Sequence, residues 1–358
     1  MRSASAARVA GAGVGALVGI GAAAVVAERR LAKARSARKA GVAGAERLGG
    51  LHCDPVTVTA EDGVRLHAEI DQPSPQDAAA DPARATVVFV HGYTLNLDCW
   101  HFQRRHLRQV HRRRRAVFYD QRSHGRSERS SPAHATVDQL GRDLLSVMDA
   151  LAPDEPVVLV GHSMGGMAII ALAEQHPELF GSRVVGAALI STTAGGLHTS
   201  RALSRLIPDR VGALVAPRLV AGLARVPELV DTVRRRGSNI GFLVADRFAF
   251  GDDVPASYVE FVDEMIAATP FEVLAEFYPQ FDALDKFAVL ETFAKVPTTI
   301  VTGTGDRLTS VGHSRKMASR IDGARLVECE GAGHMVILEC SDRVNAALDE
   351  LCRRADRR

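Results

Sequence analysis

The sequence predicts an α/β fold: a mostly parallel, doubly wound sheet with a helical cap insertion, preceded by an N-terminal apolar helix. Short apolar runs without a polar face alternate with amphipathic stretches, as expected of parallel strands that helices cover on both sides. A long segment without a convincing strand, between two such runs, indicates the cap. We therefore expect an N-terminal segment, a first core half, a cap and a second core half at residues 1–50, 51–195, 196–290 and 291–358.

The expected sheet begins with a hairpin. Two β-rich runs at residues 56–59 and 65–70 flank Glu61-Asp62-Gly63, a sequence typical of tight turns. The later strands are continuous apolar runs at residues 86–90, 116–119, 157–160, 184–190, 298–301 and 325–329. Helical periodicity lies between them at residues 137–151, 164–175, 311–320 and 343–352. A hairpin that leads into parallel strands is a doubly wound layout.

Composition excludes several classes of protein. With 46% hydrophobic and 24% charged residues, the chain is neither collagen-like nor disordered. Residues 1–48 hold nine basic and two acidic residues, a net charge of +7. Since the whole chain has a net charge of +2, the remaining residues carry −5, which gives no case for nucleic-acid binding. The five cysteines lack CxxC spacing, which argues against a zinc site or a full disulfide framework. We expect no metal and no cofactor, because no dinucleotide fingerprint is present either.

The N-terminal segment contains nineteen residues without a polar side chain, at 9–27. A helix of this length spans roughly 28 Å, close to the thickness of a bilayer's hydrocarbon core. Six basic residues follow it at positions 29–39, which favours a retained membrane anchor with a cytoplasmic catalytic domain and a linker attracted to anionic lipid. The alternatives are a signal peptide cleaved near Ala27, with export of the body, and a loosely ordered leader.

A candidate nucleophile follows the expected strand at 157–160. Gly161-His162-Ser163-Met164-Gly165-Gly166 has the G-x-S-x-G pattern in a strand–turn–helix context. Gly161 and Gly165 leave room for neighbouring backbone to pack closely around the strained serine. The start of the next helix then favours negative charge that develops beside Ser163.

A base and an orienting acid follow two later strands. His334 comes after the last expected strand, and Asp306 after the strand at 298–301. The carboxyl ends of parallel strands share one edge of the sheet, so both should lie near Ser163. Taken singly, His334 could be a surface histidine and Asp306 a helix N-cap; the chain order Ser…Asp…His is the more specific signal. Glu328 and Glu330 are alternative carboxylates.

An oxyanion hole requires two N–H donors. Met164, directly after the nucleophile, supplies one backbone N–H, and the turn after the strand at 86–90 should supply the other from Tyr93. Gly92 permits the tight turn. We expect His91 to support this turn through hydrogen bonds and not to act as a base.

Together these motifs resemble the α/β-hydrolase superfamily over about residues 53–358, the cap excepted. The shared features are His91-Gly92, Asp120-x-Arg122-x-x-Gly125-x-Ser127, the Gly161–Gly166 elbow, Asp306 and Gly333-His334. The resemblance implies a serine hydrolase with Ser163, Asp306 and His334 as triad, and Arg122 as a brace between loops. Ser123 stands where many members have glycine, and Leu308-Thr309 where a proline is common.

The function that follows is cleavage of a small-molecule carboxylic ester. Acyl transfer, perhydrolysis, C–C bond hydrolysis, peptidase action and a non-catalytic binding role stay open, because fold does not fix function. Nine of the thirteen phenylalanines lie between Phe242 and Phe293. At helical spacing, as for Phe277 and Phe281, they either hold the cap on the core or line a pocket for lipophilic esters. Arginine groups at 112–115 and 234–236 are expected on solvated faces.

Overall fold

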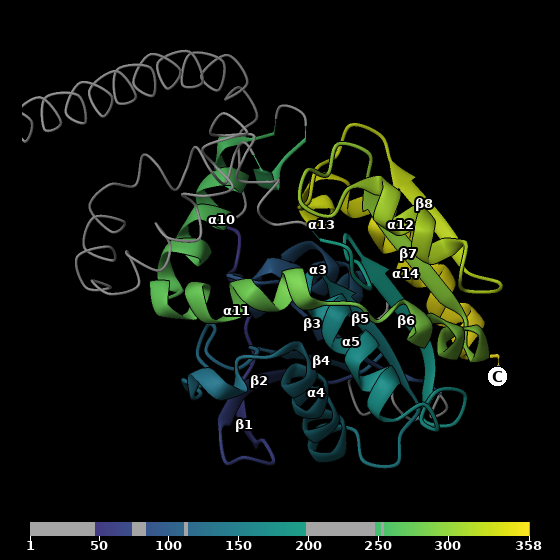
Figure 1. The fold of residues 1–358 in the computed structure, drawn as a ribbon, viewed down its shortest axis with the longest axis horizontal. Helices are drawn as coiled ribbons and strands as arrows, with labels where there is room; N and C mark the ends of the chain where they lie inside the picture. Colours follow the sequence, from purple (N-terminus) through teal and green to yellow (C-terminus); the bar gives the residue numbers. More distant parts are fainter. Residues whose placement is uncertain (1–46, 74–83, 111–113, 198–247, 252–253, 358) are drawn as a thin grey trace, which may run out of the picture. The chain divides into compact units, whose positions relative to one another are not determined.

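The structure is a computed structural model that describes residues 47–73, 84–110, 114–197, 248–251 and 254–357. The described parts of Leu48–Val254 and Tyr258–Arg358 form one compact unit, built on an eight-stranded sheet (Figure 1). The strand order is β1-β2-β4-β3-β5-β6-β7-β8. Their bounds are β1 Pro55–Thr59, β2 Arg65–Asp71, β3 Thr86–Val90, β4 Ala116–Tyr119, β5 Val157–His162, β6 Val184–Ile190, β7 Thr298–Gly303 and β8 Arg325–Cys329.

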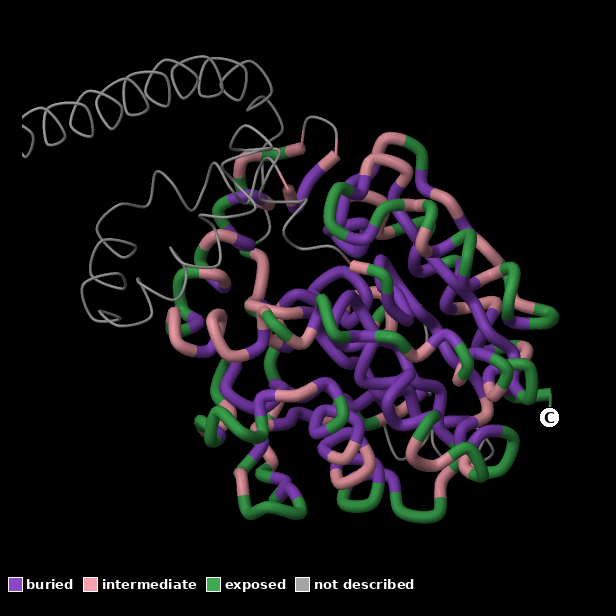
Figure 2. Tube along the Cα trace, in the orientation of Figure 1, coloured by how far each residue is buried: buried purple, intermediate pink, exposed green. Residues whose placement is uncertain are grey.

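The sheet is mostly parallel, which confirms the predicted fold class. The β1–β2 hairpin and the β2–β4 pair are antiparallel. Every later pair, from β3–β4 to β7–β8, is parallel. All eight predicted strands are present. Central strands such as β3, β4 and β5 are buried along their whole length, as their continuous apolar runs predict, and Figure 2 shows this buried centre.

Helices cover both faces of the sheet. Along β5, Val157 and Leu159 join the apolar cluster that includes α4 (Val137–Leu151) and α5 (Met164–Gln175). The alternate residues Val158 and Val160 join the opposite cluster. That second cluster includes α3 (His101–Val110), α13 (Val336–Glu339) and α14 (Ser341–Ala355), while α12 (Val311–Ala318) packs beside β7 and β8.

The described part of the expected cap is helical. It contains α10 (Ala256–Ala268) and α11 (Phe271–Ala283), followed by a 3₁₀ segment at Phe287–Lys295. Phe277 is fully buried and Phe281 is 8% exposed, and both belong to the cluster of α4 and α5. These two phenylalanines therefore hold the cap on the core.

Two predictions concern the N-terminal part and an arginine group. Residues 9–27 lie outside the described residues; among those described, none forms a helix long and apolar enough to cross a membrane.

The expectation of a solvated face at 112–115 is wrong for Arg114, which is 5% exposed. Its guanidinium bonds the carboxylate of Asp356 at 2.5 Å and the carbonyl of Ala85 at 2.8 Å, contacts that sequence periodicity does not reveal.

Candidate active site

Ser163 sits at the turn between β5 and α5 in a strained conformation. Its φ of 52° and ψ of −118° lie outside the regions that most residues favour, at a cost of about 1–3 kcal/mol. The surroundings impose this geometry: the Ser163 N–H donates to the Ile190 carbonyl at 2.9 Å, and the Thr192 hydroxyl donates to the Ser163 carbonyl at 2.6 Å. Such stored strain is typical of functional turns.

The glycines around Ser163 bring three backbone segments into contact. A Cβ on Gly165 would lie 2.1 Å from the Val90 carbonyl oxygen, and one on Gly161 would lie 2.6 Å from the Gly165 backbone. A Cβ on Gly92 would lie 3.1 Å from Cβ of Ser163. The turn after β3 therefore packs directly against Ser163, which only glycine at these positions allows.

Asp306 and His334 form a buried pair at the carboxyl edge of the sheet. Nδ1 of His334 lies 2.9 Å from Oδ2 of Asp306, and the two side chains are 8% and 0% exposed. The Asp306 carboxylate also accepts the N–H groups of Leu308 and Thr309 at 2.8 and 2.9 Å, and the Thr309 hydroxyl at 2.8 Å. Burial by itself would raise the pKa of Asp306, but His334 and these hydrogen bonds lower it below its ordinary value. An ionised Asp306 can thus orient the imidazole.

His162 links the Ser163 turn to His334. The His162 Nε2–H donates to the His334 carbonyl at 2.9 Å, and the two rings lie 4.9 Å apart. Burial, with a smaller contribution from His334, lowers the pKa of His162 to about 3, so its ring is neutral. Because Nδ1 of His334 faces Asp306, its Nε2 is the ring atom available as a base.

The predicted oxyanion turn is braced from both sides. His91 is fully buried, with Nδ1 donating to the Gly92 carbonyl at 2.7 Å and Nε2 accepting the Gln121 N–H at 2.9 Å. Burial and the neighbouring His124 lower its pKa to about 3, so a neutral His91 supports the turn. The Tyr93 hydroxyl donates to the Leu274 carbonyl of α11 at 2.5 Å, which ties this turn to the cap.

Met164 begins α5, where the first N–H groups of a helix have no partner within the helix. Its side chain is fully buried. A backbone N–H here, directly after Ser163, lies where the helix dipole favours negative charge.

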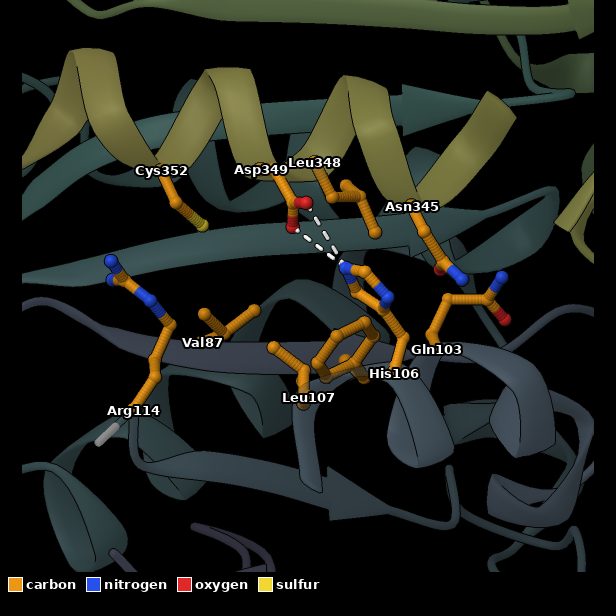
Figure 3. Close-up of a pocket in the computed structure, with 10 residues that line it drawn as sticks. Val87, Gln103, His106, Leu107, Arg114, Asn345, Leu348, Asp349 and Cys352 are labelled. Carbon is orange, nitrogen blue, oxygen red and sulfur yellow. Dashed lines mark hydrogen bonds and ion pairs between the residues drawn. The ribbon is translucent and has the colours of Figure 1, made fainter. Parts of the chain in front are cut away.

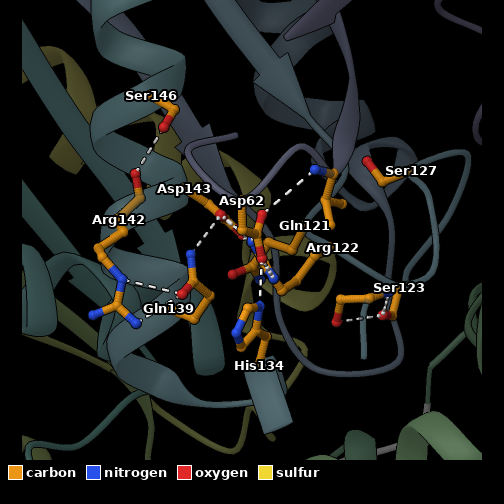
Figure 4. A network of polar contacts seen from close by, with 12 residues as sticks. Asp62, Gln121, Arg122, Ser123, Ser127, His134, Gln139, Arg142, Asp143 and Ser146 are labelled. Carbon is orange, nitrogen blue, oxygen red and sulfur yellow. Dashed lines mark hydrogen bonds and ion pairs between the residues drawn. The ribbon is translucent and has the colours of Figure 1, made fainter. Parts of the chain in front are cut away.

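Arg122 bridges two carboxylates from distant parts of the sequence, as Figure 4 shows. Its fully buried guanidinium binds Asp143 at 2.6 Å and Asp62 at 2.8 Å, and Asp62 also pairs with His134 at 2.6 Å. These contacts fix the hairpin turn of β1 and β2 to α4. Arg122 thus braces loops and lies away from the Asp306–His334 pair.

A hollow lies between α3 and α14 (Figure 3). Its lining includes the His106–Asp349 ion pair, Arg114 and Cys352. Ser163, Asp306 and His334 are not part of that lining, and it opens at a different place from the carboxyl edge. The predicted site residues Ser163, Asp306 and His334 lie instead at the carboxyl edge. Among the described residues, no cluster of His, Cys, Asp or Glu could hold a metal ion.

Comparison with known proteins identifies the family. The profile described as "Alpha/beta hydrolase family" matches residues 87–347. The chain belongs to this α/β-hydrolase family. A Caulobacter sp. (strain K31) protein named for carbamate hydrolysis, RutD, is 27% identical over 234 residues, 65% of this chain and 79% of the relative.

Solved α/β-hydrolase structures share the fold. A thermophilic esterase from Thermogutta terrifontis superposes with a TM-score of 0.64 at 22% identity, over 85% of this chain and 100% of its own. The enol-lactonase from Burkholderia xenovorans LB400 gives 0.61 at 24% identity, over 83% and 100%. At these identities the likeness shows the fold alone.

Sequence reasoning missed the polar contacts that support this α/β-hydrolase site. Thr309 was visible only as a departure from a common proline, yet its hydroxyl bonds Asp306. The sequence likewise contained no signal for the bond from His162 to the His334 carbonyl. Glu328, which the sequence offered as an alternative carboxylate to Asp306, pairs instead with Arg315, at 2.7 Å from its guanidinium.

Proposed function

We propose that this α/β hydrolase cleaves carboxylic esters through an acyl-enzyme intermediate formed on Ser163. The observation that carries the proposal is the buried Asp306–His334 pair, 2.9 Å apart, at the sheet edge where the strained Ser163 turn lies. Nucleophile, base and orienting acid are the parts that such catalysis requires. The names of the two structural neighbours, an esterase and an enol-lactonase, describe ester cleavage and support this substrate class.

The proposed reaction has two halves. Ser163 attacks the ester carbonyl while His334 takes its proton, and the imidazolium then protonates the leaving alkoxide. Water next attacks the acyl-enzyme with His334 again as base, which releases the acid and restores the serine. The N–H groups of Tyr93 and Met164 bind the tetrahedral oxyanion, a contribution of about 3 kcal/mol for one donor.

We also propose that the preferred acyl groups are lipophilic. The ring of Tyr93, next to the proposed oxyanion donor, packs 5.1 Å from that of Phe281, so the oxyanion turn meets the cap through an apolar contact. Phe277 and Phe281 are buried in the core, so the support for this preference is the apolar ring of Tyr93 beside the proposed oxyanion donor.

A series of p-nitrophenyl esters from acetate to palmitate tests both proposals. The wild-type chain should hydrolyse them, with kcat/KM rising from acetate to at least butyrate or hexanoate. Ser163→Ala should abolish turnover. A flat profile would refute the lipophilic preference, and activity retained in Ser163→Ala would refute the mechanism.

For residues 9–27 we propose a membrane anchor that keeps the catalytic domain in the cytoplasm. The support is the uninterrupted apolar run and the basic residues after it. Full-length protein should stay in the membrane fraction after a carbonate wash. A mature chain in the medium that begins after Ala27 would overturn the proposal.

A further inference from the structure

Glu339, the last residue of α13, joins two segments that are far apart in the sequence. Its Oε1 accepts the N–H of Gly333 at 2.8 Å, and its Oε2 accepts the N–H of Gly251 at 3.0 Å. Gly333 immediately precedes His334, whereas Gly251 lies on the segment 249–251, within the expected cap and before α10. One carboxylate therefore holds the histidine loop and this segment together.

The two segments are in backbone contact around this carboxylate. A Cβ on Gly251 would lie 1.9 Å from the Gly331 carbonyl oxygen, and one on Gly333 would lie 2.3 Å from the Gly251 nitrogen. The Met335 N–H donates to the Ala249 carbonyl at 2.7 Å, on the other side of His334. The histidine loop is thus fixed to segment 249–251 both before and after His334, and no side chain could fit between them.

The histidine loop is also held on its opposite side. The Gly305 N–H donates to the Ala332 carbonyl at 2.9 Å, and the Gly331 N–H donates to the Thr304 hydroxyl at 2.9 Å. These bonds attach the loop to the turn that carries Asp306. Loss of the Glu339 contacts would leave the Met335–Ala249 bond and the bonds to the Asp306 turn in place, so the loop would loosen just before His334 without general unfolding.

The charge of Glu339 determines how well it accepts two N–H groups. Burial is the main influence on the pKa of Glu339, and together with the nearby Asp306 carboxylate it raises this pKa to about 7. The two hydrogen bonds and His334 act in the opposite direction and lower it. The Cys340 thiol lies next to it in the chain and is neutral, since its pKa is raised. Glu339 therefore changes charge near neutral pH, and its ionised form is the better double acceptor.

We propose that Glu339 is a positioning residue for catalysis: it clamps the His334 loop to segment 249–251 and so holds the imidazole in its productive place against Asp306. This inference rests on the proposed function, in which His334 is the base. Glu339 does not contact the reacting atoms, and its effect passes through the Gly333 N–H.

The test compares Glu339→Gln with Glu330→Gln in the full chain. Glu330 is an exposed carboxylate on the same loop, so the control removes one charge without touching the clamp. Glu339→Gln keeps the shape but places an NH₂ group against one backbone N–H. With p-nitrophenyl butyrate as substrate, kcat should fall about tenfold or more, as for loss of a charge-assisted hydrogen bond, with KM within about twofold.

The pH profile separates positioning from general damage. In the wild type, protonation of Glu339 near neutral pH should steepen the acid limb of kcat/KM. Glu339→Gln should lose this contribution and show a shallower acid limb, whereas Glu330→Gln should keep the wild-type limb. Glu339→Asp, a second variant in case the first does not fold, should keep the carboxylate and the steeper limb at reduced kcat.

Two outcomes are distinguishable. Wild-type kcat and an unchanged acid limb in Glu339→Gln, with Ser163→Ala inactive, would overturn the clamp and leave the esterase mechanism intact. Full activity in Ser163→Ala would overturn the proposed function itself, whatever Glu339 does.

Discussion

Replacing Gly165 by alanine should damage both the stability and the activity of the chain. The added Cβ would lie 2.1 Å from the Val90 carbonyl oxygen and 2.7 Å from that of His91. Real Cβ contacts essentially never fall below 3.0 Å, so β3 and α5 must separate by about 0.9 Å, the difference between 3.0 and 2.1 Å. Overpacking of this kind costs about 1–3 kcal/mol, and a displacement near 1 Å at a catalytic site can cost about 100-fold in rate.

Gly312→Ala is the matched control for this prediction. It lies in α12, where the atom nearest to an added Cβ is the Ser310 hydroxyl at 3.7 Å, an ordinary contact. Alanine there should be neutral or stabilising by up to about 1 kcal/mol. Urea unfolding and p-nitrophenyl butyrate hydrolysis should be measured on both variants. Equal unfolding free energies and equal kcat/KM values for the two would refute the close-packing argument for the nucleophile turn.

Two further predictions concern buried carboxylates. Thr309→Val removes the hydroxyl that donates to Asp306 at 2.8 Å, so kcat/KM for p-nitrophenyl butyrate should fall about tenfold. Thr309→Ser keeps a hydroxyl and should retain most of the activity. Equal rates in the wild type and both variants would contradict this role. Burial would raise the pKa of Asp71, but hydrogen bonds from Arg108 and Arg104 lower it to about 2, so its contribution to stability is present above about pH 4 and is lost as pH falls towards 2. Asp71→Asn should therefore flatten the acid dependence of the unfolding free energy by about 2 kcal/mol over that window, and an unchanged slope would exclude the effect.

Sequence patterns were sufficient for the sheet and for the residues at its carboxyl edge. Strands such as β5 are buried on both faces, so their sequences are apolar without interruption and are recognisable locally. Ser163 and Asp306 follow strands of this kind, and His334 follows the less buried β8; the rule that parallel strands end at one edge places all three on the same side. That inference needs no knowledge of side-chain contacts.

The contacts that hold the site could not be predicted in the same way. Arg104 is 2% exposed and pairs with Glu69 and Asp71 across the β2–α3 contact, yet its sequence surroundings resemble a solvated helix face. Glu339 and Gly251 are 88 positions apart. Such pairings depend on how distant segments meet, and one sequence has no local signal for them. Helical spacing likewise could not decide whether Phe277 faces the core or a pocket.

The central claim, that Ser163 is a nucleophile activated by the Asp306–His334 pair, is tested most directly by covalent labelling. A fluorophosphonate should react with the full-length wild-type chain at one group per molecule, and peptide mass spectrometry should place that group on Ser163. Ser163→Ala should take up no label, and His334→Ala should react far more slowly. Two results would contradict the account: stoichiometric label on another residue, or ester hydrolysis by the Ser163→Ala variant at the wild-type rate.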